Sequence, residues 1–270
     1  MSKTATAIAI AFELSLILAG LVLFWRLKLS PTARQQSTNL ALTRWDAPPS
    51  EFFLSLWLIC AAAFAASMGA RLGLSRYPLS RDATAAVATA AGQLGVVIGV
   101  LVFRRFFDRS KPPALSSKEN VIGAGVVTFL LAMPLVAITS LIWQVLLNAV
   151  GIQSEKQDLI RMFLEAKSFF LLSIMTILAC VGAPLTEELV FRAGIFRYAR
   201  TRLPRWAALL LPASLFAALH QNLASFAPLV ALGILFSLAY ERTGRIGTSM
   251  IAHALFNLNS LVLILAKVDF

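Results

Sequence analysis

Charged side chains are scarce in this sequence. Asp, Glu, Lys and Arg together make up 14% of the 270 residues, whereas 59% are hydrophobic and the mean hydropathy is +0.79. An ordinary soluble domain carries about 25% charged residues. So little charge argues against a soluble globular protein, because its surface would lack the polar side chains that face water. The composition is typical of a polytopic membrane protein.

Cysteine and histidine are also rare, with two residues of each. Cys60 and Cys180 lie in apolar runs without CxxC spacing, so the sequence indicates no disulfide framework, and we interpret both as small core residues. Internal repeats, low-complexity tracts and connections long enough for a soluble domain are lacking too. We therefore predict a single membrane-embedded domain over residues 1–270.

Long apolar runs fill most of the chain. A helix needs about 20 residues to cross roughly 30 Å of hydrocarbon, and several runs reach that length. A cleaved signal peptide is the rival interpretation of the first run, but that run is too long and only Lys3 precedes it. We predict an all-α, polytopic membrane helix bundle with about eight transmembrane helices. The expected spans are residues 5–25, 52–70, 83–103, 121–150, a fifth from about 168, then 206–220, 226–240 and 246–266.

Acidic residues are the minority, so the net charge is +11. The 24 Lys and Arg residues lie in short loops beside apolar spans, as the positive-inside rule describes, and we expect no nucleic-acid partner. One set of loops holds sixteen of them, which predicts that this side is cytoplasmic and that both termini lie outside. A bacterial inner membrane is the expected setting, with an organellar membrane as the alternative. The sixteen are Arg26, Lys28, Arg34, Arg44, Arg104, Arg105, Arg109, Lys111, Lys118, Arg192, Arg197, Arg200, Arg202, Arg205, Arg242 and Arg245.

Few ionisable side chains fall inside the predicted spans. Each costs at least about 2.5 kcal/mol on insertion scales, so each is a candidate functional residue with a partner to be found. No partner for Glu13 is evident, and we expect it to have a structural or interfacial role. The full set is Glu13, Glu187, Glu188, Arg192, His220 and His253.

Helical spacing predicts different surroundings for the adjacent glutamates Glu187 and Glu188. Residues four apart share a helix face, so Glu188 and Arg192 are expected to pair, while Glu187 points about 100° away and stays free. Pro184 is expected either to kink the fifth helix or to start a new segment after Gly182. In a helix of a soluble protein, a Glu-Glu-x-x-x-Arg pattern ordinarily forms a solvent-exposed face. Here the pattern lies in an apolar run, which favours a functional role.

Two further pairs share this spacing. The Phe216 ring is expected to pack beneath the His220 imidazole, and His253 and Asn257 are expected to present a nitrogen and an amide side by side. A buried glutamate can take a proton from water, an imidazole can hold that water, and His or Asn can stabilise an oxyanion. The set therefore fits amide hydrolysis, although a lone histidine in a span is also found simply hydrogen-bonded to a neighbouring helix.

Taken in order, Glu187-Glu188-x-x-x-Arg192, Phe216-x-x-x-His220 and His253-x-x-x-Asn257 resemble the three-motif signature of the CAAX protease and bacteriocin-processing family of intramembrane endopeptidases. The resemblance covers about residues 181–257. It implies an intramembrane catalytic cavity in which Glu187 is the general base and His220 helps to position the water. His253 and Asn257 would form the oxyanion site, with Glu188, Arg192 and Phe216 in support.

The resemblance leaves the metal question open, because the family was long described as metal-dependent. Glu187, His220 and His253 make three plausible zinc ligands with a position left for water. The HExxH spacing is absent, however, and the ligands would come from three helices. We therefore favour catalysis without a cofactor, with Zn as the alternative.

The implied partners are the lipid bilayer and a membrane-associated peptide or protein substrate, prenylated or not. Two other functions stay open at this point. A proton-coupled transporter would require repeated halves, which the sequence lacks, and a noncatalytic scaffold or immunity protein would keep the same motifs. For the site to form, we expect the fifth helix to continue past Arg192 toward Arg200, which buries Arg192.

Overall fold

The computed structural model describes residues 3–31, 40–108, 120–152, 163 and 168–268. These residues form helices and no strand, which confirms the predicted all-α class. The elements are α1 (Lys3–Phe24), η1 (Trp25–Leu29), α3 (Pro49–Leu74), α4 (Arg81–Phe106), α5 (Val121–Ala149), α7 (Phe169–Ile177), η2 (Leu178–Gly182), α8 (Ala183–Glu188), η3 (Leu189–Phe196), α9 (Arg197–Arg200), α10 (Arg205–Leu219), α11 (Leu223–Thr243) and α12 (Ile246–Leu265).

Seven helices of the described segments are long and apolar enough to cross a membrane, and α10 is a shorter apolar helix. The chain is thus an integral membrane protein with about eight helices, as predicted. Their ends lie within a few residues of the expected boundaries. Local signals set several ends: the Asn120 side chain accepts from the N–H groups of Ile122 and Gly123 at the start of α5, and Gly244 adopts a φ of 64° after α11.

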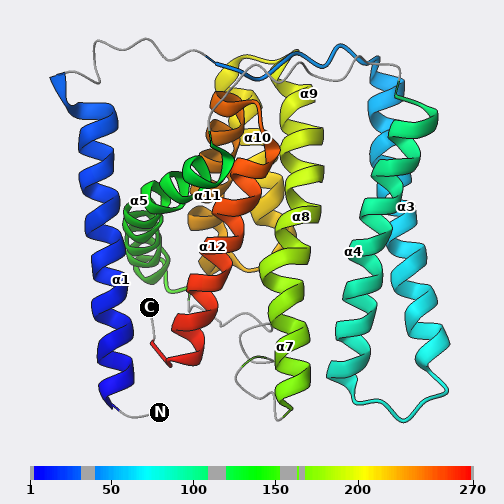
Figure 1. The fold of residues 1–270 in the computed structure, drawn as a ribbon, viewed down its shortest axis with the longest axis horizontal. Coiled ribbons are helices and arrows are strands. Elements are labelled where there is room, and N and C mark those ends of the chain that lie inside the picture. Colours follow the sequence, from blue (N-terminus) through cyan, green and yellow to red (C-terminus); the bar gives the residue numbers. More distant parts are fainter. Residues whose placement is uncertain (1–2, 32–39, 109–119, 153–162, 164–167, 269–270) are drawn as a thin grey trace.

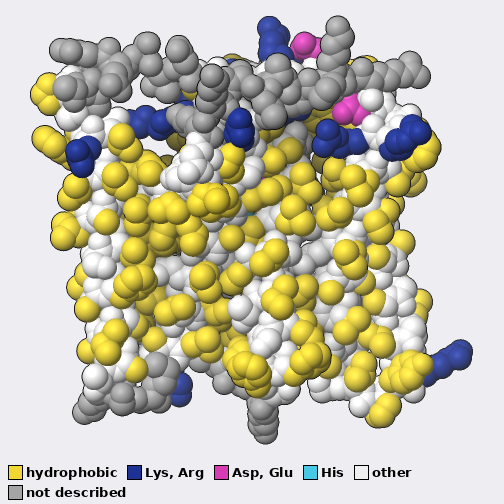
Figure 2. Space-filling view, in the orientation of Figure 1, with side chains coloured by type: hydrophobic (Ala, Val, Ile, Leu, Met, Phe, Trp, Pro, Cys, Tyr) yellow, Lys and Arg dark blue, Asp and Glu magenta, His cyan; other side chains and the backbone are white. Residues whose placement is uncertain are grey.

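The bundle has a centre and two flanks (Figure 1). Helices α8 to α12 lie in the middle, α1 lies on one side, and α3 and α4 form a hairpin on the other. Both termini lie at one end of the bundle. Lys and Arg side chains gather mainly at the opposite end, above a broad apolar band (Figure 2). We call this opposite end the basic end.

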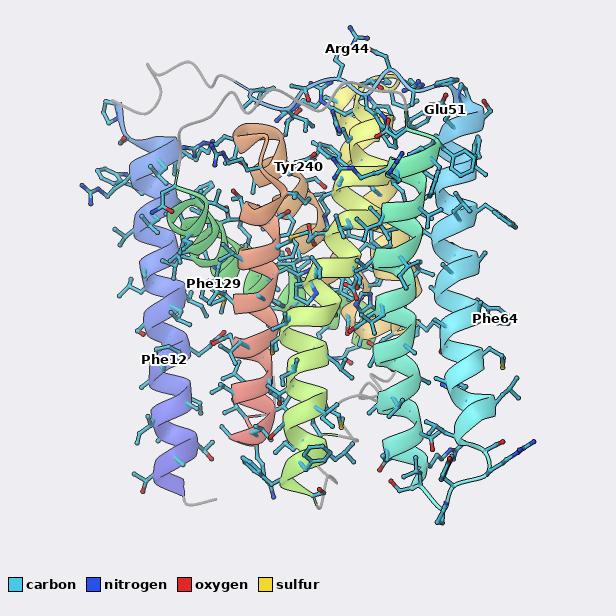
Figure 3. The ribbon with its side chains drawn as sticks, turned by 45° about the vertical axis from the view of Figure 1, so that its right-hand side comes forward. Phe12, Arg44, Glu51, Phe64, Phe129 and Tyr240 are labelled. Atoms are coloured by element: carbon cyan, nitrogen blue, oxygen red, sulfur yellow. The ribbon has the colours of Figure 1, made fainter. Side chains whose placement is uncertain are left out.

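Aromatic side chains separate the lipid-facing surface from the interior. Phe12 and Phe64 point away from the bundle and are 54% and 67% exposed, as suits side chains that contact lipid (Figure 3). Phe129 and Tyr240 are buried. Phe129 belongs to a core cluster in which α5, α11 and α12 meet. This core holds α12, which carries the third motif, against α5 and α11.

Glycines allow α3 and α4 to approach closely. Gly95 and Gly99 are four residues apart, and a Cβ on Gly99 would lie 2.7 Å from the Cα of Ile59 on α3. A Cβ on Gly95 would lie 2.5 Å from the Ala62 carbonyl oxygen. Small residues at this spacing let helix backbones pack directly in a membrane, where burial from water cannot drive association.

We expect Gly99→Val to destabilise the protein by about 1–3 kcal/mol, because the added side chain must push α3 and α4 apart. The measurement is the loss of folded protein on heating in detergent. Gly69→Val is the matched control, since a Cβ at Gly69 meets nothing within 4 Å. Equal melting temperatures for the two variants would contradict this account of the hairpin.

Candidate active site

One helical segment carries the first motif. Residues Phe169–Arg200 form a continuous apolar helix of 32 residues, so the fifth helix does continue to Arg200 as expected. Arg192 is 1% exposed, which is the burial that this continuation predicted. Regular α-helical turns alternate with π-helical turns along the segment, and α8, with Glu187 and Glu188, lies between η2 and η3. Such π-turns are frequently found at functional sites.

Pro184 lies in the first turn of α8 without starting a separate helix. The Ala183 N–H bonds to the Leu178 carbonyl in the π pattern, and the next bond of that pattern, from residue 184 to Ala179, cannot form because proline has no N–H. The Ala179 carbonyl is thereby left without its intrahelical donor. Asn257 on α12 supplies one, with Nδ2 2.8 Å from the Ala179 oxygen.

Glu188 is the centre of the buried polar cluster. It is fully buried, and its Oε1 accepts from Arg192 Nη1 at 2.9 Å, as the spacing of four predicted. The same oxygen lies 2.9 Å from His253 Nδ1. A carboxylate oxygen only accepts, so Nδ1 carries the proton. Glu188 therefore joins the first and third motifs through direct contacts.

Arg192 is enclosed by α11 and by aromatic rings. Its Nη2 donates to the Gly233 carbonyl at 3.3 Å. Its guanidinium carbon lies 4.7 Å from the centre of the Phe216 ring and 5.3 Å from that of Phe236. A cation so far from water is held by its paired carboxylate and by the negative faces of the rings.

Glu187 differs sharply from its neighbour. Its side chain is 30% exposed, whereas that of Glu188 is 0% exposed. Glu187 Oε2 is shielded from solvent, has no hydrogen-bond partner among the described residues, and lies 3.7 Å from His253 Nε2. The separation is too long for a direct hydrogen bond. Glu188 Oε2 also lacks a hydrogen-bond partner among the described residues, so the two carboxylates differ in the two bonds to Glu188 Oε1 and in the exposure of Glu187.

Phe216 links both histidines to this cluster. Its ring is 1% exposed and meets His220 edge-on at 4.8 Å and His253 at 5.9 Å between ring centres. His220 follows the last residue of α10, and its Nδ1 lies 2.8 Å from the Phe216 carbonyl oxygen. Because a carbonyl oxygen only accepts, that contact places a proton on Nδ1, and the neutral tautomer with this proton has Nε2 as an acceptor. The ring pair expected from the second motif is thus present.

The structure brings the predicted residues together to different degrees. Glu187, Glu188, Arg192, Phe216 and His253 form one set of neighbouring side chains. His220 joins it through the Phe216 ring, and Asn257 joins it through the backbone of η2. The contact of Asn257 with Ala179 gives this amide a structural partner that the spacing of the third motif did not predict.

Sequence reasoning missed three parts of the site. Phe236 stacks on His253 with ring centres 5.1 Å apart, Phe191 packs edge-on against Phe216, and the Gly233 carbonyl binds Arg192. A glycine on α11 is required because a Cβ there would lie 2.9 Å from Ala213 Cβ. Gly233 and Phe236 lie on α11, which no spacing in the sequence connects to the motifs, whereas Phe191 lies on η3 within the first motif and only the fold reveals its contact with Phe216.

Glu13 lies outside this site and does have a partner. It is 8% exposed, and its Oε2 accepts a hydrogen bond from Asn259 Nδ2 at 2.9 Å. The pair joins α1 to α12, so the structure supports the structural role expected for Glu13.

The zinc alternative can be compared with the positions of its three expected ligands. Of the three ligands it requires, Glu187 and His253 approach each other, with 3.7 Å between Oε2 and Nε2. The described residues contain no group of three or more His, Cys, Asp or Glu side chains placed to hold a metal ion. The described residues therefore do not fit a three-ligand zinc site in this conformation.

Comparison with known proteins points to the same segment. Residues 169–259 match the protein-family model described as Rce1-like, type II CAAX prenyl endopeptidase Rce1-like. The matched segment contains all seven residues of the three motifs, so the resemblance found in the sequence is confirmed for this part of the chain. No curated protein and no solved structure matches the chain.

Proposed function

On the premise of this family match, we propose that the protein is a CAAX-type intramembrane endopeptidase that hydrolyses a peptide bond in a membrane-associated or lipidated substrate. One observation carries the proposal: of two adjacent carboxylates in an apolar helix, Glu188 is fully buried and bonded twice through Oε1, while Glu187 is 30% exposed and its Oε2 lies 3.7 Å from His253 Nε2 without a hydrogen-bond partner among the described residues. An ionisable group kept in a membrane span without a bonded partner indicates a function.

Glu187 acts as the general base. Its partly exposed carboxylate accepts a proton from a water molecule held beside a histidine, and the water oxygen attacks the carbonyl carbon of the substrate. When the carbon–nitrogen bond breaks, the protonated Glu187 returns the proton to the leaving amine. The products are a carboxylic acid and an amine, which together carry both hydrogens of the water, and Glu187 is returned to its carboxylate form.

His253 stabilises the charge that develops on the carbonyl oxygen. The cluster contains two carboxylates and the single guanidinium of Arg192, so a protonated His253 brings its charge close to zero. Its Nδ1 is fixed on Glu188, which holds the Nε2 side of the ring toward Glu187. Asn257 keeps one amide hydrogen beyond its bond to Ala179 and directs it to the same oxyanion.

His220 positions the water. Because Nδ1 donates to the Phe216 carbonyl, Nε2 is an acceptor that holds one hydrogen of the water while Glu187 removes the other. Packing against the buried Phe216 ring keeps the imidazole in one orientation. The basic end would face the cytoplasm, with both termini outside, in a bacterial inner membrane.

The proposal is tested by cleavage of quenched fluorescent peptides, prenylated and unprenylated, by the purified protein in detergent. We expect cleavage at a defined bond, identified by mass spectrometry, that persists within about twofold in a strong chelator, because Glu187 and the histidines act without a metal. Loss of cleavage in chelator and its return with Zn would overturn the glutamate mechanism. A folded protein that cleaves none of the peptides would overturn the protease and favour the scaffold.

A further inference from the structure

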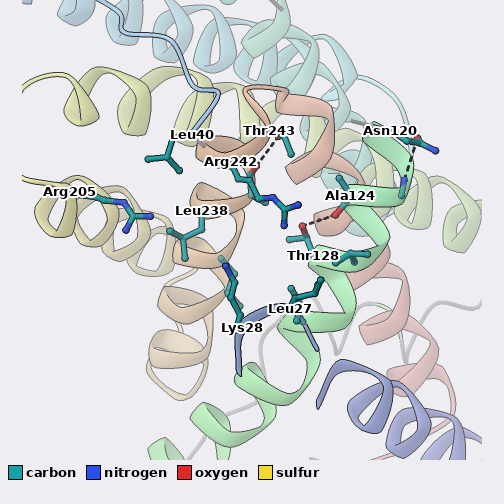
Figure 4. A pocket seen from close by; sticks show the side chains of 15 residues that line it. Leu27, Lys28, Leu40, Asn120, Ala124, Thr128, Arg205, Leu238, Arg242 and Thr243 are labelled. Atoms are coloured by element: carbon teal, nitrogen blue, oxygen red, sulfur yellow. Dashed lines mark hydrogen bonds between the residues drawn. The ribbon is translucent and has the colours of Figure 1, made fainter. Parts of the chain in front are cut away.

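A second feature lies at the basic end, away from the motif residues. A pocket of about 440 Å³ opens where η1, the start of α5, the start of α10 and the end of α11 meet (Figure 4). None of its lining residues belongs to the three motifs. A cavity of this size is within the range that takes a small ligand.

The pocket is cationic. Lys28, Arg205 and Arg242 line it, and no acidic side chain does so among the described residues. Lys28 and Arg242 extend into the space between η1, α5 and α11 (Figure 4). Arg205 donates to Glu241 through Nε and Nη2, but Glu241 also binds Arg200, so one carboxylate offsets two guanidinium groups. The local charge is therefore positive and suits an anion.

The walls of the pocket are apolar. Leu27 and Leu40 contribute from the first part of the chain, Val127 and Leu131 from α5, and Leu235 and Leu238 from α11. Free phosphate or a nucleotide has no hydrocarbon chain to pack against these apolar walls. A ligand that matches both parts has an anionic head and a hydrocarbon chain.

The position of the pocket selects one such ligand. Its basic residues stand at the ends of η1, α10 and α11, where lipid headgroups meet the hydrocarbon region, and Leu235 and Leu238 lie further into α11. The basic end is the end predicted to face the cytoplasm, and the cytoplasmic leaflet is the anionic one. Basic pockets between helices on that side suit anionic headgroups.

We propose that this pocket binds one anionic phospholipid of the adjacent leaflet, with its phosphate at Lys28, Arg205 and Arg242 and an acyl chain along the leucines. The lipid would join η1 to α5 and α11, so its binding would also stabilise the folded protein. This inference does not depend on the proposed peptidase activity.

The test is binding of dioctanoyl phosphatidylglycerol to the purified full chain in an uncharged detergent, followed by native mass spectrometry and by the melting temperature. We expect wild type to retain the lipid and the double variant Lys28→Gln/Arg242→Gln to bind it roughly 30-fold more weakly, since each basic residue near the surface contributes about fivefold. Leu238→Trp, which narrows the apolar wall but keeps the charges, should weaken binding as well. Dioctanoyl phosphatidylcholine should bind poorly to all variants.

The matched control is Arg104→Gln/Arg105→Gln, which removes two exposed charges from the same end without touching the pocket. It should bind phosphatidylglycerol like wild type. Equal weakening in both double variants would mean general attraction to a basic surface and would overturn the site. Equal binding of phosphatidylcholine, or displacement of the lipid by inorganic phosphate at matched concentration, would overturn an anionic phospholipid as the ligand.

Discussion

Glu187→Gln is expected to lower kcat for peptide cleavage by about 10³-fold, within the range that a general base contributes. The amide keeps the size of the side chain but cannot take a proton from water. Stability should stay within about 0.5 kcal/mol of wild type, because the carboxylate is partly exposed and its Oε2 makes no hydrogen bond. Initial rates at saturating peptide measure kcat, and melting curves in detergent measure the change in stability.

Two comparisons sharpen this experiment. Glu51→Gln makes the same chemical change at the start of α3, away from the site, and should leave kcat unchanged. His220→Ala should also lower kcat, because the water loses the nitrogen that holds it. Should Glu187→Gln keep more than about a tenth of wild-type kcat, the general base must lie elsewhere.

Glu188→Ala is expected to destabilise the protein by about 3–5 kcal/mol, the usual result of removing one partner of a buried ion pair. Among the described residues, Arg192 would keep only the Gly233 carbonyl as a hydrogen-bond acceptor, at 1% exposure and among aromatic rings. His253 Nδ1 would lose the carboxylate that accepts its proton. The melting temperature in detergent and the yield of folded protein measure the effect.

The double variant Glu188→Met/Arg192→Leu separates stability from activity. An apolar pair of similar volume leaves no uncompensated charge, so it should recover much of the stability that Glu188→Ala loses. It should stay inactive, since His253 lacks the carboxylate that orients it. A Glu188→Ala protein as stable as wild type, or a double variant less stable than the single one, would contradict the role given to this pair.

Contacts within one helix were predictable from spacing alone. Glu188 and Arg192, and likewise Phe216 and His220, are four residues apart, and a helix places such residues on one face whatever surrounds it. The burial of Arg192 also followed, because a helix continuing to Arg200 must carry this residue into the bundle. The helical spans themselves follow from the length of the apolar runs.

Contacts between helices could not be predicted in this way. The bond from His253 to Glu188, the stacking of Phe236 and the pairing of Glu13 with Asn259 each depend on how helices far apart in sequence are rotated and tilted. Asn257 is the clearest case. Its acceptor, the Ala179 carbonyl, is free only because a π-turn precedes Pro184, and hydrophobicity does not signal such a turn.

The sequence by itself determined that this is a helical membrane protein with three polar motifs, because insertion energies and helical periodicity act locally along the chain. The tertiary structure alone decided which glutamate is engaged. Glu187 and Glu188 are chemically identical side chains. They differ in the fold because Glu188 packs against Arg192 and His253, whereas Glu187 is partly exposed. That difference arises from packing between helices, where the surroundings of each oxygen are set by residues that are distant in sequence.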